Sequence, residues 1–321
     1  MVDDNILTDL ERFTMGSSRK SMSWQSIPPQ SSALVQRVRD LKAKATDEFS
    51  RSLIEGGACA LENPENPLRL NFFSTAMRIL FEHIMASCSP NAEVIRAPWF
   101  TPDPESKDGR PTRWQRIVFA IQGGLSEAFV LEKLHIDPLP LRKRLLTTID
   151  ELSKHIHSRE NTIIDNLAEQ DAEAEATLLA VIEFLQAISD CRAAVLEPIE
   201  EALDDAAVEA LVSETLESVD ELATHWSLEE IYVHDTSVQI IGADTIIYRA
   251  SGSISVVLQW GSNSDVRRGD GVEIEESFPF HVDFELPLDT PWAIEQAERT
   301  HHVDTKSWSD EMHPDDLDNM R

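Results

Sequence analysis

The sequence has few cysteines, no long apolar run, and fewer than half as many basic as acidic residues. Its three cysteines, Cys59, Cys88 and Cys191, are far apart and include no CxxC pair. This favours reduced thiols in a cytoplasm and argues against a disulfide framework or a cysteine-based zinc site. No apolar run approaches the roughly 18 to 20 residues that cross a bilayer. The first residues, MVDDNILTDLERF, also lack the features of a secretory signal. We therefore expect a cytoplasmic protein without membrane contact.

The common catalytic and cofactor-binding motifs are also absent. There is no P-loop, no GxSxG, no GxGxxG and no HExxH. The letters of a restriction-type metal nuclease occur in DPESK (103–107), but they lie between prolines in a predicted loop, whereas such a site needs a strand. The sequence therefore predicts no cofactor and no metal site.

Charge is unevenly distributed along the chain, whose net charge is −30. Residues 165–230 contain 19 acidic residues and a single basic one, Arg192, so their net charge is −18. Residues 110–160 contain nine basic and six acidic residues, so their net charge is +3. The acidic stretch is either a solvated helical face or a surface that docks a basic partner, and the basic stretch can meet phosphate despite the overall charge.

The first two thirds of the chain show helical spacing. Apolar residues recur every three or four positions from Ser32 to about Thr224, which predicts an all-α domain over residues 31–226. Within it, LRLNFFSTAMRILFEHIMASC is apolar around most of its surface and is expected to form a central helix. Residues 97–112 are rich in proline and are expected to form a loop. Residues 1–30, rich in serine with a proline pair, predict a flexible tail.

The hydrophobic period changes to two near Glu230. In TIIYRASGSISVVLQW and VEIEESFPFHVDFEL the even-numbered positions are apolar, with Glu276 as the exception. Two such strands predict a sheet with one buried face. We expect a small antiparallel β-domain over residues 229–290, sandwich-like or packed against helices, followed by an acidic flexible tail over residues 299–321. The predicted fold class is α+β, an all-α domain followed by this antiparallel domain.

The connection between the two strands, residues 261–271, is longer than a tight hairpin needs and is dense in Asp, Arg and Gly. It lacks the register of a calcium loop. Arg267 and Arg268 can hold an anion, because guanidinium groups suit phosphate. Alternatively, these arginines pair with Asp265 and Asp270, and the loop satisfies itself.

A second candidate site lies in RILFEH, which places Arg78 and His83 five residues apart on a predicted helix. This spacing resembles the motif of HEPN (higher eukaryote and prokaryote nucleotide-binding) helical ribonucleases. The resemblance implies that His83 is a general acid/base on the ribose 2′-hydroxyl and that Arg78 stabilises phosphate charge, without a metal. Five residues turn a helix by about 140°, so a homodimer cleft would have to bring the two side chains together. The alternative is that Arg78 forms a salt bridge and His83 packs between helices.

Further basic residues lie in the middle segment. LSKHIHSRE carries Lys154, His155 and His157 at a predicted helix end, where cations are favoured without any binding role. Together with Arg113 and Arg116 they form a candidate phosphate-binding surface. The alternative is a set of solvated helix faces.

Four blocks of the sequence resemble a known family. They are NPLRLNFFSTAMRILFEHIM, PTRWQRIVFAIQGGLSEAFV, LSKHIH and ASGSISVVLQWGSNSDVRRGDGVEIEESFPF. Their order is similar to that in bacterial proteins described as predicted prokaryotic-PIWI-associating nucleases. The resemblance implies a role in conflict with phage or plasmid, beside Argonaute-like or other defence proteins.

These patterns lead to two hypotheses. The first is a nuclease or nucleic-acid-binding component of such a system that acts on RNA or DNA. Its favoured activity is metal-independent RNA cleavage by Arg78 and His83, and Arg113, Arg116, Lys154 and His157 would guide the phosphates. The second is a non-catalytic sensor or adaptor that binds a nucleotide or a partner protein through Arg267 and Arg268.

Overall fold

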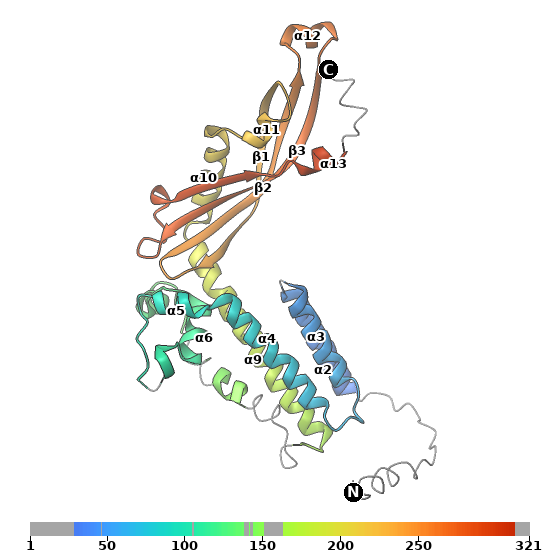
Figure 1. Ribbon diagram of the computed structural model, residues 1–321, viewed down its shortest axis with the longest axis vertical. Helices are drawn as coiled ribbons and strands as arrows, with labels where there is room; N and C mark the ends of the chain where they lie inside the picture. The colour runs from blue at the N-terminus through green and yellow to red at the C-terminus, as the bar shows by residue number, and fades with distance from the viewer. Residues whose placement is uncertain are drawn as a thin grey trace, which may run out of the picture.

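The computed structural model of the protein describes residues 29–45, 47–104, 106–137, 141, 144–150 and 163–311. Helices come first in the chain and a four-stranded antiparallel sheet follows (Figure 1). The predicted α+β class is therefore confirmed. The segments 1–28, 151–162 and 312–321, which include Lys154, His157 and most of the two expected tails, lie outside the described residues.

Four helices form the bundle that makes up one end of the molecule: α2 (Pro29–Asp40), α3 (Glu48–Leu61), α4 (Arg69–Cys88) and α9 (Leu167–Leu196). The apolar residues whose spacing predicted a helix after Ser32 are all buried: Leu34, Val35, Val38 and Leu41. The last of these begins the short 3₁₀ helix η1 (Leu41–Lys44). The helix α3 begins where Asp47 accepts a hydrogen bond from the backbone N–H of Ser50 (2.8 Å), as N-cap residues do.

The helix α9 connects the bundle to the sheet. Its 30 residues span about 45 Å, and it contacts α4, α6 and β1. Near its start Asp171 pairs with the fully buried Arg69 (2.6 Å), whose guanidinium group also donates to the carbonyl of Leu61. A buried arginine needs such partners, because an unpaired charge in the core is costly.

Shorter helices pack beside the bundle or along the sheet. They are α5 (Asn91–Arg96), η2 (Lys107–Gly109), α6 (Arg113–Gln122), α7 (Glu127–Glu132), α10 (Glu200–Ser213) and α11 (Glu217–Asp220). The proline-rich residues 97–112 are otherwise irregular, as expected.

The sheet has the order β1-β2-β3-β4, with β1 (His225–Ile241), β2 (Thr245–Trp260), β3 (Val272–Pro287) and β4 (Glu298–Val303). The predicted apolar face is buried from Ile246 to Leu258 and from Phe278 to Leu286. Val272, at the far end of the same face, is 42% exposed. It lies where the β2–β3 hairpin extends away from the helices, with α12 (Asn263–Arg268) at its tip (Figure 1).

The segment from Arg299, expected to be a loose tail, differs from expectation. It begins inside β4, and α13 (Lys306–Glu311) follows after η4 (Ile294–Gln296) and β4. In β4 only Val303 is buried. Arg299 and His301 instead pair with two carboxylates of the α10 region, Glu209 (3.6 Å) and Glu214 (2.8 Å). Ion pairs with the helices replace the alternating apolar pattern that marks the other strands.

The largest apolar cluster of the described residues spans helices and sheet. One cluster of buried residues includes Phe81 and Phe184 from the bundle as well as Tyr248 and Phe284 from the sheet. A second cluster fills the bundle between α2, α3, α4 and α9. The sheet therefore completes the core of the helical part, and the surface where they meet is shared by both.

Candidate functional site

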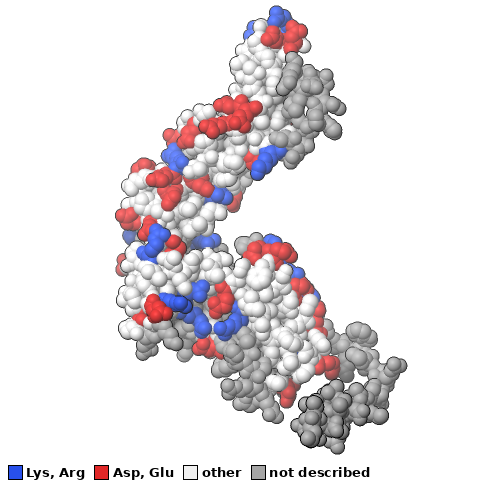
Figure 2. All heavy atoms as spheres, in the orientation of Figure 1, with Lys and Arg blue, Asp and Glu red and all other residues white. Residues whose placement is uncertain are grey.

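A cavity of about 490 Å³, here called the junction cavity, lies between the bundle and the sheet. Its walls come from η1, the start of α3, the second half of α4, α9 and β1. Figure 2 shows the surface hollowed between the end of the bundle and the sheet. The volume is in the range of small-molecule sites.

His83 of α4 lines this cavity and is held from one side. Its Nε2 lies 3.3 Å from Oδ2 of Asp47, and the ring of Phe49 packs edge-on at 5.0 Å between centroids. Hydrogen bonds from Ser50, and a smaller contribution from His83, lower the pKa of Asp47 from 3.8 to about 2. Asp47 is therefore ionised at neutral pH and can fix the tautomer and orientation of the imidazole ring.

Two cations share the cavity with His83. Arg192 of α9 and Lys44 at the end of η1 line it, and neither forms an ion pair within the described part of the chain. Asp47 is the only carboxylate among the lining residues. A chain of net charge −30 therefore carries a locally cationic cavity, which favours an anionic ligand.

The pairing of Asp47 with His83 could not be predicted from the sequence, because the two residues are 36 positions apart. Arg192 could have been found from the charge pattern. It is the single basic residue among the 19 acidic ones of residues 165–230, and this isolation could have indicated a functional cation.

The cavity also contains a thiol, Cys88, but not a nucleophile. Burial raises the pKa of Cys88, and it raises that of the neighbouring Cys191 to about 12. Arg192 acts in the opposite direction on both thiols, but its effect is smaller. Both groups are therefore protonated at neutral pH, and neither has the thiolate character that nucleophilic catalysis requires.

Arg78 lies on α4, partly exposed, and is not among the residues that line the junction cavity. The structure thus separates it from the space that His83 faces. Arg192, from another helix of the same chain, is the arginine brought into that space.

The two candidate phosphate-binding arginines of α6 are engaged with carboxylates. Arg113 pairs with Asp150 at 3.3 Å, and Arg116 lies 3.9 Å from Glu82 and donates to the carbonyl of Ser89. Lys and Arg side chains do gather over the region of α6 on the face in Figure 2. A phosphate bound there would have to compete with these partners. The other two members of the predicted surface, Lys154 and His157, lie outside the described residues.

The connection between β2 and β3 is largely self-satisfied. Ser262 and Asp265 form a capping box at the start of α12, and Arg268 pairs with Asp265 (2.5 Å) and Asp270 (3.7 Å). This confirms internal pairing for Arg268. Arg267 is exposed, forms no ion pair with any described residue, and lines an open hollow of about 730 Å³.

Among the described residues, no three His, Cys, Asp or Glu side chains are grouped so that they could hold a metal ion. None of the helices in the described ranges has both the length and the apolar composition needed to cross a membrane.

Comparisons with known proteins identify a family. Two family models, each described as a predicted pPIWI-associating nuclease, match residues 42–185 and residues 188–309. No curated protein and no solved structure matches the chain. Because the two matches together cover nearly all of residues 42–309, which include α3, α4, α9 and the sheet, the chain belongs to the family of predicted pPIWI-associating nucleases.

Proposed function

We propose that the protein is an RNA-cleaving nuclease that acts in a prokaryotic conflict system, with His83 in the junction cavity as its general base. The observation that carries this proposal is the contact of His83 Nε2 with Asp47 Oδ2 at 3.3 Å, in the wall of a cavity that Arg192 and Lys44 make cationic. A histidine oriented by a carboxylate beside a bound anion is the arrangement that general acid–base catalysis uses.

The chemistry follows from the tautomer. When Nε2 carries the proton and donates a hydrogen bond to Asp47, Nδ1 of His83 has the lone pair that a general base needs. His83 takes the proton of the ribose 2′-hydroxyl, and O2′ attacks the adjacent phosphorus. The bond from phosphorus to O5′ breaks, O5′ takes a proton from solvent water, and protonated His83 returns its proton to solvent. The products are a 2′,3′-cyclic phosphate and a 5′-hydroxyl, and the nucleophile is O2′ and not a metal-bound water.

The cations supply the electrostatic part of the mechanism. Negative charge increases on the non-bridging phosphate oxygens as O2′ attacks, and the guanidinium group of Arg192 can donate two hydrogen bonds to them. Lys44 adds a second positive charge at the cavity. In this mechanism Arg192 takes the role that the spacing of RILFEH suggested for Arg78, and one chain supplies every group.

The test is incubation of the purified protein with end-labelled RNA and DNA, with magnesium and separately with EDTA. RNA cleavage that survives EDTA is expected to fall at least about 100-fold in His83→Ala. Asp47→Asn is a second variant, because Asn keeps an N-cap residue for α3 and removes the charge beside His83. Since the lowered pKa of Asp47 means that its charge also stabilises the fold, cleavage is compared well below the melting temperature of both proteins, where we expect it to be reduced. Arg192→Ala should lose activity, and Arg78→Ala should not.

Two other outcomes of this experiment would contradict the proposal or its choice of arginine. Cleavage only with magnesium, unaffected by His83→Ala, would overturn the proposal. Loss of activity in Arg78→Ala with retention in Arg192→Ala would restore the assignment made from the RILFEH spacing.

The second candidate function is a sensor or adaptor, and the exposure of Arg267 favours it. This arginine has no ion-pair partner among the described residues and lines its hollow together with Trp226 and Gln259. The absence of any cleavage, with nucleic-acid or PIWI-like protein binding that Arg267→Ala abolishes, would make it the better description. Because Arg268 is already paired internally, Arg268→Ala should matter less.

A further inference from the structure

The junction cavity has two chemically different ends. The helices α4 and α9 run parallel and in register along it, because Arg69 meets Asp171 near their starts and the ring of Phe81 packs on that of Phe184 further along (5.3 Å between centroids). Positions on one helix can therefore be matched with positions on the other. His83 follows Phe81 by two residues, and Ile188 and Ser189 follow Phe184 closely.

The end toward the bundle is apolar. Leu41, Ile54 and Leu80 line it, each at most 3% exposed, together with the partly buried Leu185. Flat or branched apolar groups pack against such a surface, and a charged group would lose its hydration there without compensation.

The end toward the sheet is rich in hydrogen-bond donors. Ser87, Ser189 and Ser237 line it beside Arg192. Ser237 accepts a hydrogen bond from the side chain of Gln239 (2.9 Å), so its own hydroxyl hydrogen is available to a ligand. Side chains on a helix lean toward its N-terminus, so Arg192, beyond Ser189 on α9, leans back toward the level of His83.

We propose that the junction cavity binds a single nucleotide of a single-stranded chain, with the base against Leu41, Ile54 and Leu80 and the phosphate on Arg192. This places the ribose at His83, between the two ends. The choice of a nucleotide over other amphipathic anions rests on the proposed function. The cavity volume of about 490 Å³ suits one nucleotide and not a base pair, so the substrate is an unpaired strand.

Binding is measured by isothermal titration calorimetry on the full chain with adenosine 5′-monophosphate, adenosine and inorganic phosphate. The nucleotide should bind at least about tenfold more tightly than either fragment, because only it engages both ends. Arg192→Ala should weaken nucleotide binding at least about tenfold. Ser189→Phe, which adds bulk at the exposed rim, should also weaken it. Arg37→Ala is the control, since that arginine is exposed, pairs with Glu175 and lies outside the cavity.

The outcomes separate this inference from the cleavage proposal. Nucleotide binding that depends on Arg192, in a protein that cleaves no RNA, would support the binding site and overturn the catalytic role of His83. RNA cleavage that depends on His83, without any binding of the nucleotide at millimolar concentration, would overturn the inference and leave cleavage standing. Equal binding by wild type and Arg192→Ala would also overturn it, as would equal cleavage of single-stranded and duplex RNA.

Discussion

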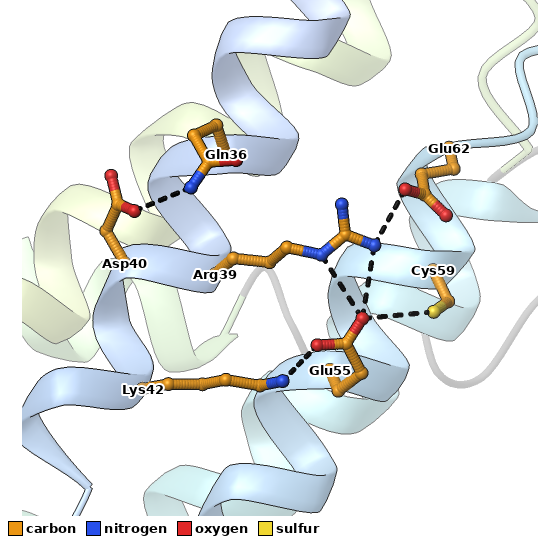
Figure 3. A network of polar contacts seen from close by, with 7 residues as sticks. All are labelled: Gln36, Arg39, Asp40, Lys42, Glu55, Cys59 and Glu62. Carbon is orange, nitrogen blue, oxygen red and sulfur yellow. Dashed lines mark hydrogen bonds and ion pairs between the residues drawn. The ribbon is translucent and has the colours of Figure 1, made fainter.

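At the scale of single residues, Glu55 of α3 links this helix to both α2 and η1. Its carboxylate accepts from Lys42 of η1 and from Arg39 of α2, and the thiol of Cys59 lies 3.5 Å away (Figure 3). Arg39 also reaches Glu62 (2.7 Å). Hydrogen bonds from Lys42, and then from Arg39, lower the pKa of Glu55 from 4.5 to about 2.

This shift predicts a pH dependence of stability. Because the folded pKa of Glu55 lies below its ordinary value, the stabilisation is complete above pH 4.5 and is lost as the pH falls toward 2. Glu55→Gln should therefore lower the urea midpoint at pH 7, and the difference from wild type should shrink between pH 4.5 and 3. Glu65→Gln is the control, an exposed carboxylate without an ion pair in the described chain. A constant difference across this pH range would contradict the assignment.

At the scale of elements, the antiparallel pairing of β1 with β2 depends on a glycine, Gly252. Gly252 pairs with Val233 next to a register shift in β1, and a Cβ at Gly252 would lie 1.8 Å from the carbonyl oxygen of Tyr232. The strand can therefore bulge toward β2 only where it meets a glycine.

Gly252→Ala should accordingly destabilise the fold, by about 1–3 kcal/mol or more, since backbone has to move. Gly56→Ala is a matched control, because this exposed position in α3 has no atom within 4 Å of an added Cβ. It should stabilise the protein by about 0.5–1 kcal/mol through helix propensity. Urea unfolding of both variants tests the pair, and a neutral Gly252→Ala would show that the bulge tolerates a side chain.

At the scale of the whole molecule, helices and sheet dock through the turn after α6. A Cβ on Gly123 would lie 2.2 Å from the carbonyl oxygen of Ile241, and one on Gly124 would lie 2.3 Å from that of Ala243. The N–H of Gly124 donates to the carbonyl of Gly242 (2.8 Å). The two glycines of IQGG, in the sequence block that resembles the family, therefore allow the helical part and the sheet to pack backbone against backbone.

Substitution at this contact should affect the molecule as a unit. Gly124→Ala is expected to lower the free energy of unfolding by about 1–3 kcal/mol or more, with hydrogen exchange rising in the sheet and in α9 together, because they share one core. Arg96→Ala removes only exposed ion pairs, with Glu93 and with Asp244, so it should lower the free energy of unfolding far less. Faster exchange in the sheet alone would show that the parts unfold separately.

Much of the fold could be predicted from local patterns in the sequence. The spacing of Leu34, Val35 and Val38 corresponds to a buried helix face. The alternation in β2 and in the second half of β3 corresponds to the buried face of the sheet. The strand β4 had no such pattern, because Arg299 and His301 face carboxylates of the α10 region instead of the core. In the candidate site, His83 was singled out from the sequence. Asp47 and Arg192 were not, since neither is a neighbour of His83 along the chain.

The sequence by itself determined the α+β class, the helical and alternating segments and the family resemblance, because these depend on residues close together in the chain or on ordered blocks. The tertiary structure alone decided which cations share a cavity with His83 and how Gly123 and Gly124 are used. It also decided that Arg268 is paired, whereas Arg267 forms no ion pair with any described residue. The junction cavity arises where η1, α3, α4, α9 and β1 converge, and Gly123 and Gly124 meet residues more than 100 positions away. Contacts between segments so far apart in the sequence leave no local period to detect.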